Sequence, residues 1–187
     1  MTLPAPVGVI HGRFQLLHND HLRYLLAGRE RCRHLVVGIT NPDPGRSRPE
    51  TADAHRCDPA ANPLTYFERQ AMVRAALTAA GTAEADFTVV PFPVSFPELY
   101  RYYVPLNALF FLTIYDAWGR RKREYFAGLG LRIEVLWEVS PEQKGLSGTD
   151  VRRLMATGGA WRELVPPSVA ALAEAWGLPA RLAAAGG

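Results

Sequence analysis

The stretch VGVIHGRFQLLHNDH, residues 7–21, decides the fold of this chain. Its first five residues, 7–11, are an apolar run that ends at Gly12, and a short run with these boundaries predicts a buried strand. Leucines at helical spacing follow the stretch, and Asn19 or Asp20 is available to cap the helix that they predict. Strand, loop and helix in this order predict the start of a β-α-β unit.

The same alternation continues along the chain. Further strands are predicted at 35–40, 87–94, 108–114 and 131–139, and further helical segments at 97–103, 116–128, 149–159 and 168–177. A longer helix is expected to follow Asn62, with Asn62 as its cap, Pro63 at its first position and Gly81 as its stop. Because parallel strands that alternate with helices need right-handed crossovers, the pattern predicts a doubly wound, largely parallel α/β sheet.

Length and composition limit the class of protein. With 187 residues the chain has the size of one domain, and we expect residues 1–187 to form a single one. No apolar run approaches the roughly 20 residues of a membrane helix, and the start shows no secretory signal, so we expect a cytoplasmic protein with no membrane partner. Cys32 and Cys57 do not form a disulfide framework, and we expect both to be reduced.

The charge balance favours small anionic ligands. With 21 Lys and Arg against 18 Asp and Glu the net charge is +3, which is mild for a nucleic-acid-binding protein and suits a protein with anionic substrates. The basic excess is clustered at residues 120–123. A solvated helix face is one explanation of this cluster and RNA binding is another, but no companion RNA-binding module is visible, so we expect no nucleic-acid partner.

Residues 41–61 form a polar segment with several prolines and no period. A structureless segment of this length is unusual inside a compact domain, which leaves a functional lid or a disordered insertion. Arg46, Arg48 and Arg56 favour an active-site lid. The segment follows the second strand, and ligands of such sheets bind at the carboxyl ends of the strands.

A phosphate site is predicted where the first strand meets its helix. Backbone N–H groups at a helix start are unpaired and the helix dipole favours an anion there, while Gly12 allows the backbone to approach closely. His18 and His21 are three residues apart, so both imidazoles lie on one face of the first turn. The standard phosphate loops GxxxxGK[ST] and GxGxxG are absent, so the phosphates of a nucleotide would have to be bound by a different motif.

Two simpler explanations apply to an isolated HxxH pair. One histidine can be a helix cap and the other a surface residue, which is the commoner case. A metal pair is the second explanation, but two imidazoles need at least a third ligand, and no other Cys, His or Asp motif has matching spacing. We therefore expect no metal-ligating residues.

Three motifs occur in order between residues 12 and 152. Residues 12–15 (Gly12, Arg13, Phe14, Gln15) are followed by His18 and His21, residues 62–65 (NPLT) by Glu68, Arg69 and Met72, and residues 147–152 read SGTDVR. They resemble the GRFQPxHxGH, NPFTxxERxxM and SGTxIR motifs of the HxGH-type nucleotidylyltransferase superfamily, specifically its archaeal-type nicotinamide mononucleotide adenylyltransferase branch. The resemblance implies a Rossmann-like sheet of five parallel strands in the order 3-2-1-4-5, followed by C-terminal helices.

Two positions depart from these motifs. Leu16 replaces the usual proline, and Asp20 replaces the glycine between the histidines. An aspartate beside a triphosphate is repulsive unless it caps the helix or helps to hold Mg²⁺, and we expect the cap. The segments 111–122 and 39–44 resemble instead the cytidylyltransferases of phosphonate and phosphinate antibiotic pathways.

The resemblance implies in-line attack of an acceptor oxygen on the α-phosphorus of a nucleoside triphosphate, with release of pyrophosphate. His18 and His21 would contact the α- and β-phosphates, and Arg152 would act with them. The nucleotide would further be bound by Gly12, Arg13, Phe14, Gln15, Ser147, Gly148 and Thr149. Mg²⁺ would be held mainly by substrate phosphates and water. Taken alone, SGTD is more often a helix cap followed by solvated arginines.

A small anionic acceptor needs charge-assisted hydrogen bonds, for which Arg120, Lys122 and Arg69 are the candidates. Arg69 is also explained as a structural partner of Glu68 or as a contact of the lid. A nicotinamide acceptor would need an aromatic face, although an aromatic stripe is more often core. Candidates for that face are Phe92, Phe96, Tyr100, Tyr103 and Trp118.

We therefore expect transfer of CMP from CTP to a small phosphonate such as phosphonoformate, in natural-product biosynthesis. The first alternative is transfer of AMP from ATP to nicotinamide or nicotinate mononucleotide. A second is a non-catalytic nucleotide-binding protein in which Asp20 has disabled the site. The sequence leaves the oligomeric state open, with a homo-oligomer among the options.

Overall fold

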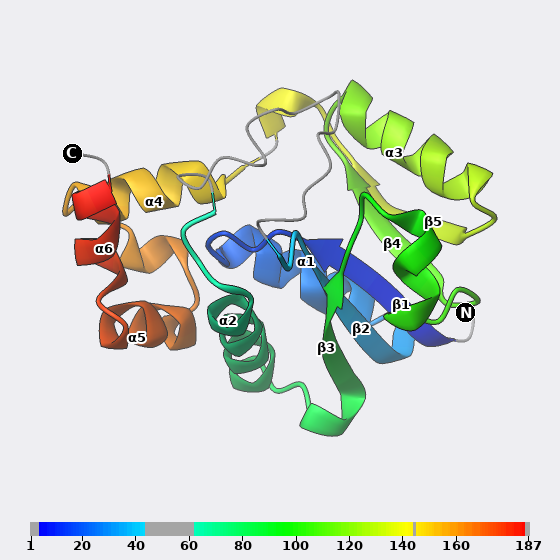
Figure 1. The fold of residues 1–187 in the computed structure, drawn as a ribbon, viewed down its shortest axis with the longest axis horizontal. Coiled ribbons are helices and arrows are strands. Elements are labelled where there is room, and N and C mark those ends of the chain that lie inside the picture. Colours follow the sequence, from blue (N-terminus) through cyan, green and yellow to red (C-terminus); the bar gives the residue numbers. More distant parts are fainter. Residues whose placement is uncertain (1–3, 44–61, 144, 186–187) are drawn as a thin grey trace.

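A five-stranded parallel sheet forms the centre of the molecule (Figure 1), in a computed structural model that describes residues 4–43, 62–143 and 145–185. The strands are β1 Ala5–Gly12, β2 Cys32–Thr40, β3 Phe87–Phe92, β4 Leu109–Ile114 and β5 Arg132–Glu138. They lie side by side in the order β3-β2-β1-β4-β5. The expected Rossmann-like fold and its strand order 3-2-1-4-5 are confirmed.

β1 is the central strand, which pairs with β2 along most of its length and with β4 at Gly8 and Val9. Its consecutive residues Val9 and Ile10 are both fully buried, although they point to opposite faces of the sheet. A strand covered on both faces is apolar without alternation, which is the pattern that predicted it. The strand order reverses between β1 and β4, and ligands of doubly wound sheets bind at such a switch point.

Helices cover both faces of the sheet. Within the described residues the α-helices are α1 Asn19–Arg29, α2 Tyr66–Ala79, α3 Ala117–Gly128, α4 Gly148–Ala156, α5 Pro167–Ala175 and α6 Leu178–Ala185. Short 3₁₀ helices are η4 Glu84–Asp86, η5 Pro97–Tyr102, η6 Pro141–Gln143 and η7 Arg162–Leu164. α4, α5 and α6 gather on one side of the molecule, away from the N-terminus (Figure 1).

The buried side chains form two clusters, one on each face. The larger cluster contains Ile10 together with Leu25 of α1 and Met72 of α2, and it continues into the C-terminal helices through Val169. The smaller cluster packs Val9 and other strand residues against η5 and α3. The C-terminal helices therefore share a core with the sheet, which fixes the position of α4 relative to β1.

Both expected N-caps of the long helices are wrong. α1 is capped by His18 rather than by Asn19 or Asp20, and the Asp20 carboxylate instead accepts a hydrogen bond from the backbone N–H of Leu146. The expectation failed because a contact 126 residues away along the chain takes the carboxylate that a local rule assigns to the helix start.

The helix expected after Asn62 begins later, at Tyr66, with Thr65 as its cap. Thr65 Oγ1 accepts from the backbone N–H of Glu68, and Glu68 Oε2 accepts from the backbone N–H of Thr65 at 2.8 Å. This reciprocal pair is a capping box, and it sets the start of the helix more strongly than the preceding proline does. The Ala-rich tail also adds α6, which the sequence did not predict.

Most of the expected lid, residues 44–61 with Cys57, lies outside the described residues. Cys32 is buried and has a free thiol. Among the described helices none combines the length and the hydropathy needed to cross a bilayer, and the cytoplasmic location stays a prediction.

Candidate active site

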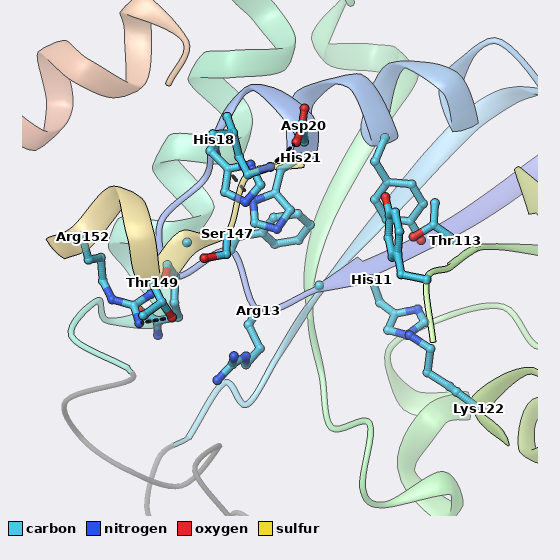
Figure 2. Close-up of a pocket in the computed structure, with 17 residues that line it drawn as sticks. His11, Arg13, His18, Asp20, His21, Thr113, Lys122, Ser147, Thr149 and Arg152 are labelled. Carbon is cyan, nitrogen blue, oxygen red and sulfur yellow. Dashed lines mark hydrogen bonds between the residues drawn. The ribbon is translucent and has the colours of Figure 1, made fainter. Parts of the chain in front are cut away.

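A cavity of about 370 Å³ opens at the carboxyl ends of β1 and β4. Its lining comes from the loop after β1, the start of α1, the end of β4, α3 and the start of α4. Figure 2 shows two groups of side chains around it. The histidine group consists of His18, His21, Ser147, Thr149 and Arg152. The lysine group consists of His11, Thr113 and Lys122.

His18 and His21 are held as a stacked pair at the start of α1. His18 is the N-cap residue, in an extended conformation with φ −124° and ψ 175°. Its ring lies 3.7 Å from the ring of His21, with 24° between the planes, and its backbone N–H donates to His21 Nδ1 at 3.4 Å. Figure 2 shows both rings pointing from α1 toward Ser147 and Arg13. One turn of helix thus presents two imidazoles to the cavity.

Both imidazoles are uncharged at neutral pH in this environment. Burial lowers the pKa of His18 to about 4, and the nearby Asp20 carboxylate opposes that shift. The pKa of His21 is also well below its ordinary value, mainly because of burial and then because of the adjacent His18. Within the described part of the chain, His18 Nδ1 is buried and has no hydrogen-bond partner. A neutral imidazole can still donate one N–H to a phosphate oxygen.

The loop between β1 and α1 is fixed by contacts to α2 and the residues before it. The Gln15 side chain donates to the carbonyl of Leu64 and accepts from its N–H, both at 2.9 Å. Gln15 is therefore a structural residue through its side chain. Phe14 is buried and has a φ of 50°, a backbone conformation that is uncommon for a residue other than glycine and that occurs often at functional sites.

Arg69 on α2 completes this scaffold. Its guanidinium is buried and donates to four backbone carbonyls, those of Arg13 at 3.0 Å, Thr40 at 2.7 Å, Asn41 at 2.8 Å and Thr65 at 3.3 Å. Burial lowers its pKa to about 10, so it remains charged at neutral pH. Arg69 does not line the cavity, and it orders the ends of β1 and β2 rather than pairing with Glu68.

The start of α4 provides the other half of the histidine group. Ser147 caps the helix, since its Oγ accepts from the N–H of Asp150 at 3.1 Å. Gly148 lies so close to the loop after β1 that a Cβ built there would be 2.7 Å from the Gln15 carbonyl oxygen. The unpaired N–H groups of this first turn therefore approach the same loop as the two histidines.

Arg152 lies one turn into α4 and links it to the loop after β1. It donates to the Gln15 carbonyl and, at 3.2 Å, to Thr149 Oγ1. Partial burial lowers its pKa, as does the positive charge of Arg13. Arg13 and Arg152 both line the cavity and their positive charges oppose each other, so such a pair of guanidinium groups suits a polyanion that would lie between them.

The lysine group lies on the other side of the cavity (Figure 2). Lys122 Nζ is 4.6 Å from the ring centroid of Trp118, which positions the ammonium group by a cation–π contact. His11 is 6% exposed and its ring lies about 5.4 Å from Phe92 and 5.3 Å from Phe126. The sequence motifs did not predict a function for His11. A polar residue at the carboxyl end of a central strand is the signal that would have found it.

The structure brings together most of the predicted site residues. Those that line the cavity are Gly12, Arg13, Phe14, Gln15, His18, His21, Lys122, Ser147, Gly148, Thr149 and Arg152. The other two acceptor candidates lie elsewhere. Arg69 is part of the scaffold described above, and Arg120 donates from Nε to Glu138 at 2.8 Å on the surface. Of the three, Lys122 is the one that faces the cavity.

The aromatic candidates for the alternative nicotinamide acceptor do not form one face. Phe92 and Tyr100 are buried in the smaller core cluster. Phe96 and Tyr103 line a separate cavity of about 300 Å³, beside Asn41 at the end of β2. The cavity that holds the histidine pair contains none of the five.

Comparison with known proteins gives two kinds of relative. The chain is 52% identical over 180 residues to the phosphonoformate cytidylyltransferase of Streptomyces viridochromogenes, and the match covers 96% of this chain and 97% of that protein. It is 29% identical over 164 residues to the nicotinamide-nucleotide adenylyltransferase of Thermococcus kodakarensis, covering 87% and 79%.

A solved structure supports the fold. A bifunctional NMN adenylyltransferase/ADP ribose pyrophosphatase from Francisella tularensis matches with a TM-score of 0.63 and 14% identity over 91% of this chain. The match covers 49% of that protein, so this chain spans about half of its length. At this identity the likeness concerns the architecture alone.

A family model described as cytidylyltransferase-like matches residues 9–154, which include both histidines and Arg152. The expected resemblance and the expected class, a nucleotidyltransferase enzyme, are confirmed by these matches. The individual roles of the cavity residues stay predictions. Because the family model covers most of its length, this chain belongs to the cytidylyltransferase-like family.

Proposed function

We propose that this enzyme transfers the cytidylyl group of CTP to a small phosphonate such as phosphonoformate and releases pyrophosphate. The observation that carries the proposal is the convergence of His18, His21 and Arg152, from the two ends of the chain, on one cavity. The 52% identity to a phosphonoformate cytidylyltransferase over nearly the whole of both chains supports the choice of substrates.

The histidine group suits the triphosphate. The start of α4 offers backbone N–H groups, and Arg152 and Arg13 offer charged donors for the outer phosphates. The neutral imidazoles of His18 and His21 would donate to the α- and β-phosphates, where charge changes during the reaction. Neutral donors at this point bind the transition state without holding the pyrophosphate product as tightly as two imidazolium groups would.

The lysine group suits the acceptor. Lys122 supplies a positive charge, and His11 and Thr113 supply polar groups beside it. A phosphonoformate ion has no apolar body, so its affinity must come from such charge-assisted hydrogen bonds. The cavity volume of about 370 Å³ is at the lower end of the range for small-molecule sites, which agrees with one nucleotide and a very small acceptor.

The chemistry needs no general base. An oxygen of the phosphonate, already ionised near neutral pH, attacks the α-phosphorus of CTP. The bond from that phosphorus to the bridging oxygen breaks, and pyrophosphate leaves with the bonding electron pair. The protein aligns the attacking phosphonate oxygen with the leaving bridging oxygen and stabilises charge on the phosphates. Each of these contributions lowers the activation free energy of such transfers substantially.

Mg²⁺ fits this site as a companion of the substrate. Among the described residues no cluster of three His, Cys, Asp or Glu side chains could hold a metal ion, and Asp20 is the one carboxylate that lines the cavity. Mg²⁺ binds phosphate oxygens and water with few protein ligands. Bound to the triphosphate, it would neutralise charge on the leaving pyrophosphate.

The test is a pyrophosphate-release assay that crosses CTP, ATP, GTP and UTP with phosphonoformate, 2-hydroxyethylphosphonate and nicotinamide mononucleotide. We expect turnover with CTP and phosphonoformate well above every other pair. Lys122→Ala should raise the KM for the phosphonate on the order of 10-fold with little change in the KM for CTP. Arg120→Ala, which removes a neighbouring charge outside the cavity, is the matched control and should leave both constants unchanged.

Transfer of AMP to nicotinamide mononucleotide is the second candidate. The cavity beside Asn41, lined by Phe96 and Tyr103, is the observation that favours it, because a nicotinamide ring stacks on aromatic side chains. Turnover with ATP and the mononucleotide, and none with CTP and any phosphonate, would replace the first proposal with this one. No pyrophosphate from any pair would favour the non-catalytic alternative.

A further inference from the structure

Asp20 occupies an unexpected position in the site. It lies between His18 and His21 on the first turn of α1, and its side chain lines the cavity (Figure 2). Its Oδ2 accepts a hydrogen bond of 2.7 Å from the backbone N–H of Leu146. Leu146 directly precedes Ser147, the cap of α4. One carboxylate therefore joins the starts of the two helices that face the cavity.

The segment before α4 is shaped around this carboxylate. Gly145 has a φ of 75°, in the left-handed region that favours glycine. A Cβ built on Gly145 would overlap Asp20 Oδ2, so any other residue at this position would push the carboxylate aside. Asp20 Oδ2 therefore has two independent contacts with residues 145–146. It lies in the space left by the missing side chain of Gly145, and it accepts the N–H of Leu146.

The charge of Asp20 is unfavourable beside a triphosphate, so its presence needs a compensating gain. Capping α1 is not that gain, because His18 occupies the N-cap position and the Asp20 carboxylate accepts from Leu146 instead. A hydrogen bond from a backbone N–H to a carboxylate is stronger than one between neutral groups, and it holds the start of α4 at a fixed distance from the stacked histidines. Preorganised donors stabilise a transition state only when their spacing is fixed.

We propose that Asp20 is a positioning residue that sets the gap between the start of α1 and the start of α4, and thereby the binding of the polyphosphate across it. This inference rests on the proposed function only in that the cavity binds a triphosphate. It concerns neither the base of the nucleotide nor the acceptor.

Asp20→Asn and Asp20→Ala test the proposal as a matched pair. Both variants remove the negative charge, but the asparagine Oδ1 can still accept from the Leu146 N–H. The first measurement is the affinity of each variant for inorganic triphosphate by calorimetry, without Mg²⁺, acceptor or nucleoside. We expect the alanine variant to bind on the order of 10-fold more weakly than the asparagine variant. Hydrogen exchange at residues 145–147 should be faster in the alanine variant alone.

Kinetics with the active substrate pair give the second readout. Asp20→Ala should raise the KM for the triphosphate and lower kcat, whereas Asp20→Asn should restore both toward the wild-type values. Thermal unfolding of both variants shows whether any loss merely reports a misfolded protein. If the two variants bind triphosphate equally, the hydrogen bond does not position the site and the proposal fails. If both variants demand more Mg²⁺ for half-maximal activity, and bind triphosphate equally without Mg²⁺, Asp20 is a metal ligand and the proposal also fails.

Gly145→Ala disturbs the contact between Asp20 and residues 145–146 from the α4 side. Its added Cβ should weaken triphosphate binding in the wild-type background and less so in the Asp20→Ala background, where the overlapping oxygen is gone. Purely additive losses would contradict the proposed contact. Inorganic triphosphate contains neither the base nor the acceptor. The binding results therefore test the role of Asp20 independently of the pyrophosphate-release panel, which tests the proposed substrates.

Discussion

The starts of α1 and α4 face the same cavity but are built in different ways. At α1 the functional side chains and the contact that aligns them lie within one turn, since His18 and His21 stack on each other. At α4 the alignment depends on distant residues. Arg152 donates to the Gln15 carbonyl 137 residues earlier, and Leu146 donates to Asp20 126 residues earlier.

This difference separates the two tasks of the proposed phosphate site. A local turn is enough to present hydrogen-bond donors, because a helix start always has unpaired N–H groups. Placing two such turns at a useful distance from each other needs contacts that cross the fold. The loop after β1 carries both tasks, since its residues line the cavity and its backbone carbonyls accept hydrogen bonds from Arg152 and Arg69.

The largest expected effect comes from removing a donor at the locally built helix start. His18→Ala should lower kcat on the order of 10²-fold or more, because it removes a donor to the phosphates at which charge develops. His34→Ala, a histidine on β2 that contacts Thr88 outside the cavity, should leave turnover unchanged. Steady-state pyrophosphate release measures both. An unchanged rate for His18→Ala would remove this residue from the site.

A smaller loss is expected from displacing the helix start that is positioned from a distance. Gly148→Ala would bring a Cβ to 2.7 Å from the Gln15 carbonyl oxygen, and the loop cannot easily move because Gln15 is bonded to Leu64. We expect about 1–3 kcal/mol of destabilisation, typical of overpacking, and a raised KM for the triphosphate.

Gly128→Ala is the matched control for this overpacking experiment. Gly128 is the last residue of α3, and a Cβ built there meets no atom within 4 Å. The change should be neutral or slightly stabilising, since alanine loses less conformational entropy than glycine in a helix. Urea denaturation of the two variants compares their stabilities directly. Equal stabilities would show that α4 has room to move away from the loop.

The same division explains what the sequence could predict. Apolar runs such as 7–11 and 35–40 predicted the strands, because burial on both faces leaves a pattern that needs no partner to recognise. The strand order was implied by the resemblance to the nucleotidylyltransferase motifs, and the structure confirms it. The His18 and His21 pair was likewise visible, since helical spacing places both on one face. These features depend on neighbours in sequence, and their prediction succeeded for that reason.

Residues whose role depends on a distant partner were not predictable in the same way. Asp20 looked like a cap because local rules assign aspartate to helix starts, while its actual partner is the Leu146 N–H. Arg69 had two open explanations, and three of its four backbone acceptors come from distant segments whose proximity only the folded chain defines. His11 was not predicted to line the cavity, because it is part of the run 7–11 that predicted β1.

The smallest expected effect is the pH dependence of folding stability that comes from the burial of His18 at the start of α1. The His18 pKa of about 4 lies below the value of about 6.5 in an unfolded chain, so the native state binds fewer protons between these values. The stability present above pH 6.5 is therefore lost as the pH falls toward 4. Between pH 7.5 and 5.5 the loss from His18 amounts to about 1 kcal/mol.

Comparing wild-type protein with His18→Gln at the two pH values isolates this contribution, because glutamine does not titrate. NMR titration of the His18 ring should show a pKa below 5 in the free protein and a higher one with inorganic triphosphate, since an anion beside the ring favours its charged form. An ordinary pKa near 6.5 in the free protein would mean that solvent reaches His18 freely. In that case the start of α1 would present a charged imidazole, and the pair would bind phosphate by charge rather than as preorganised neutral donors.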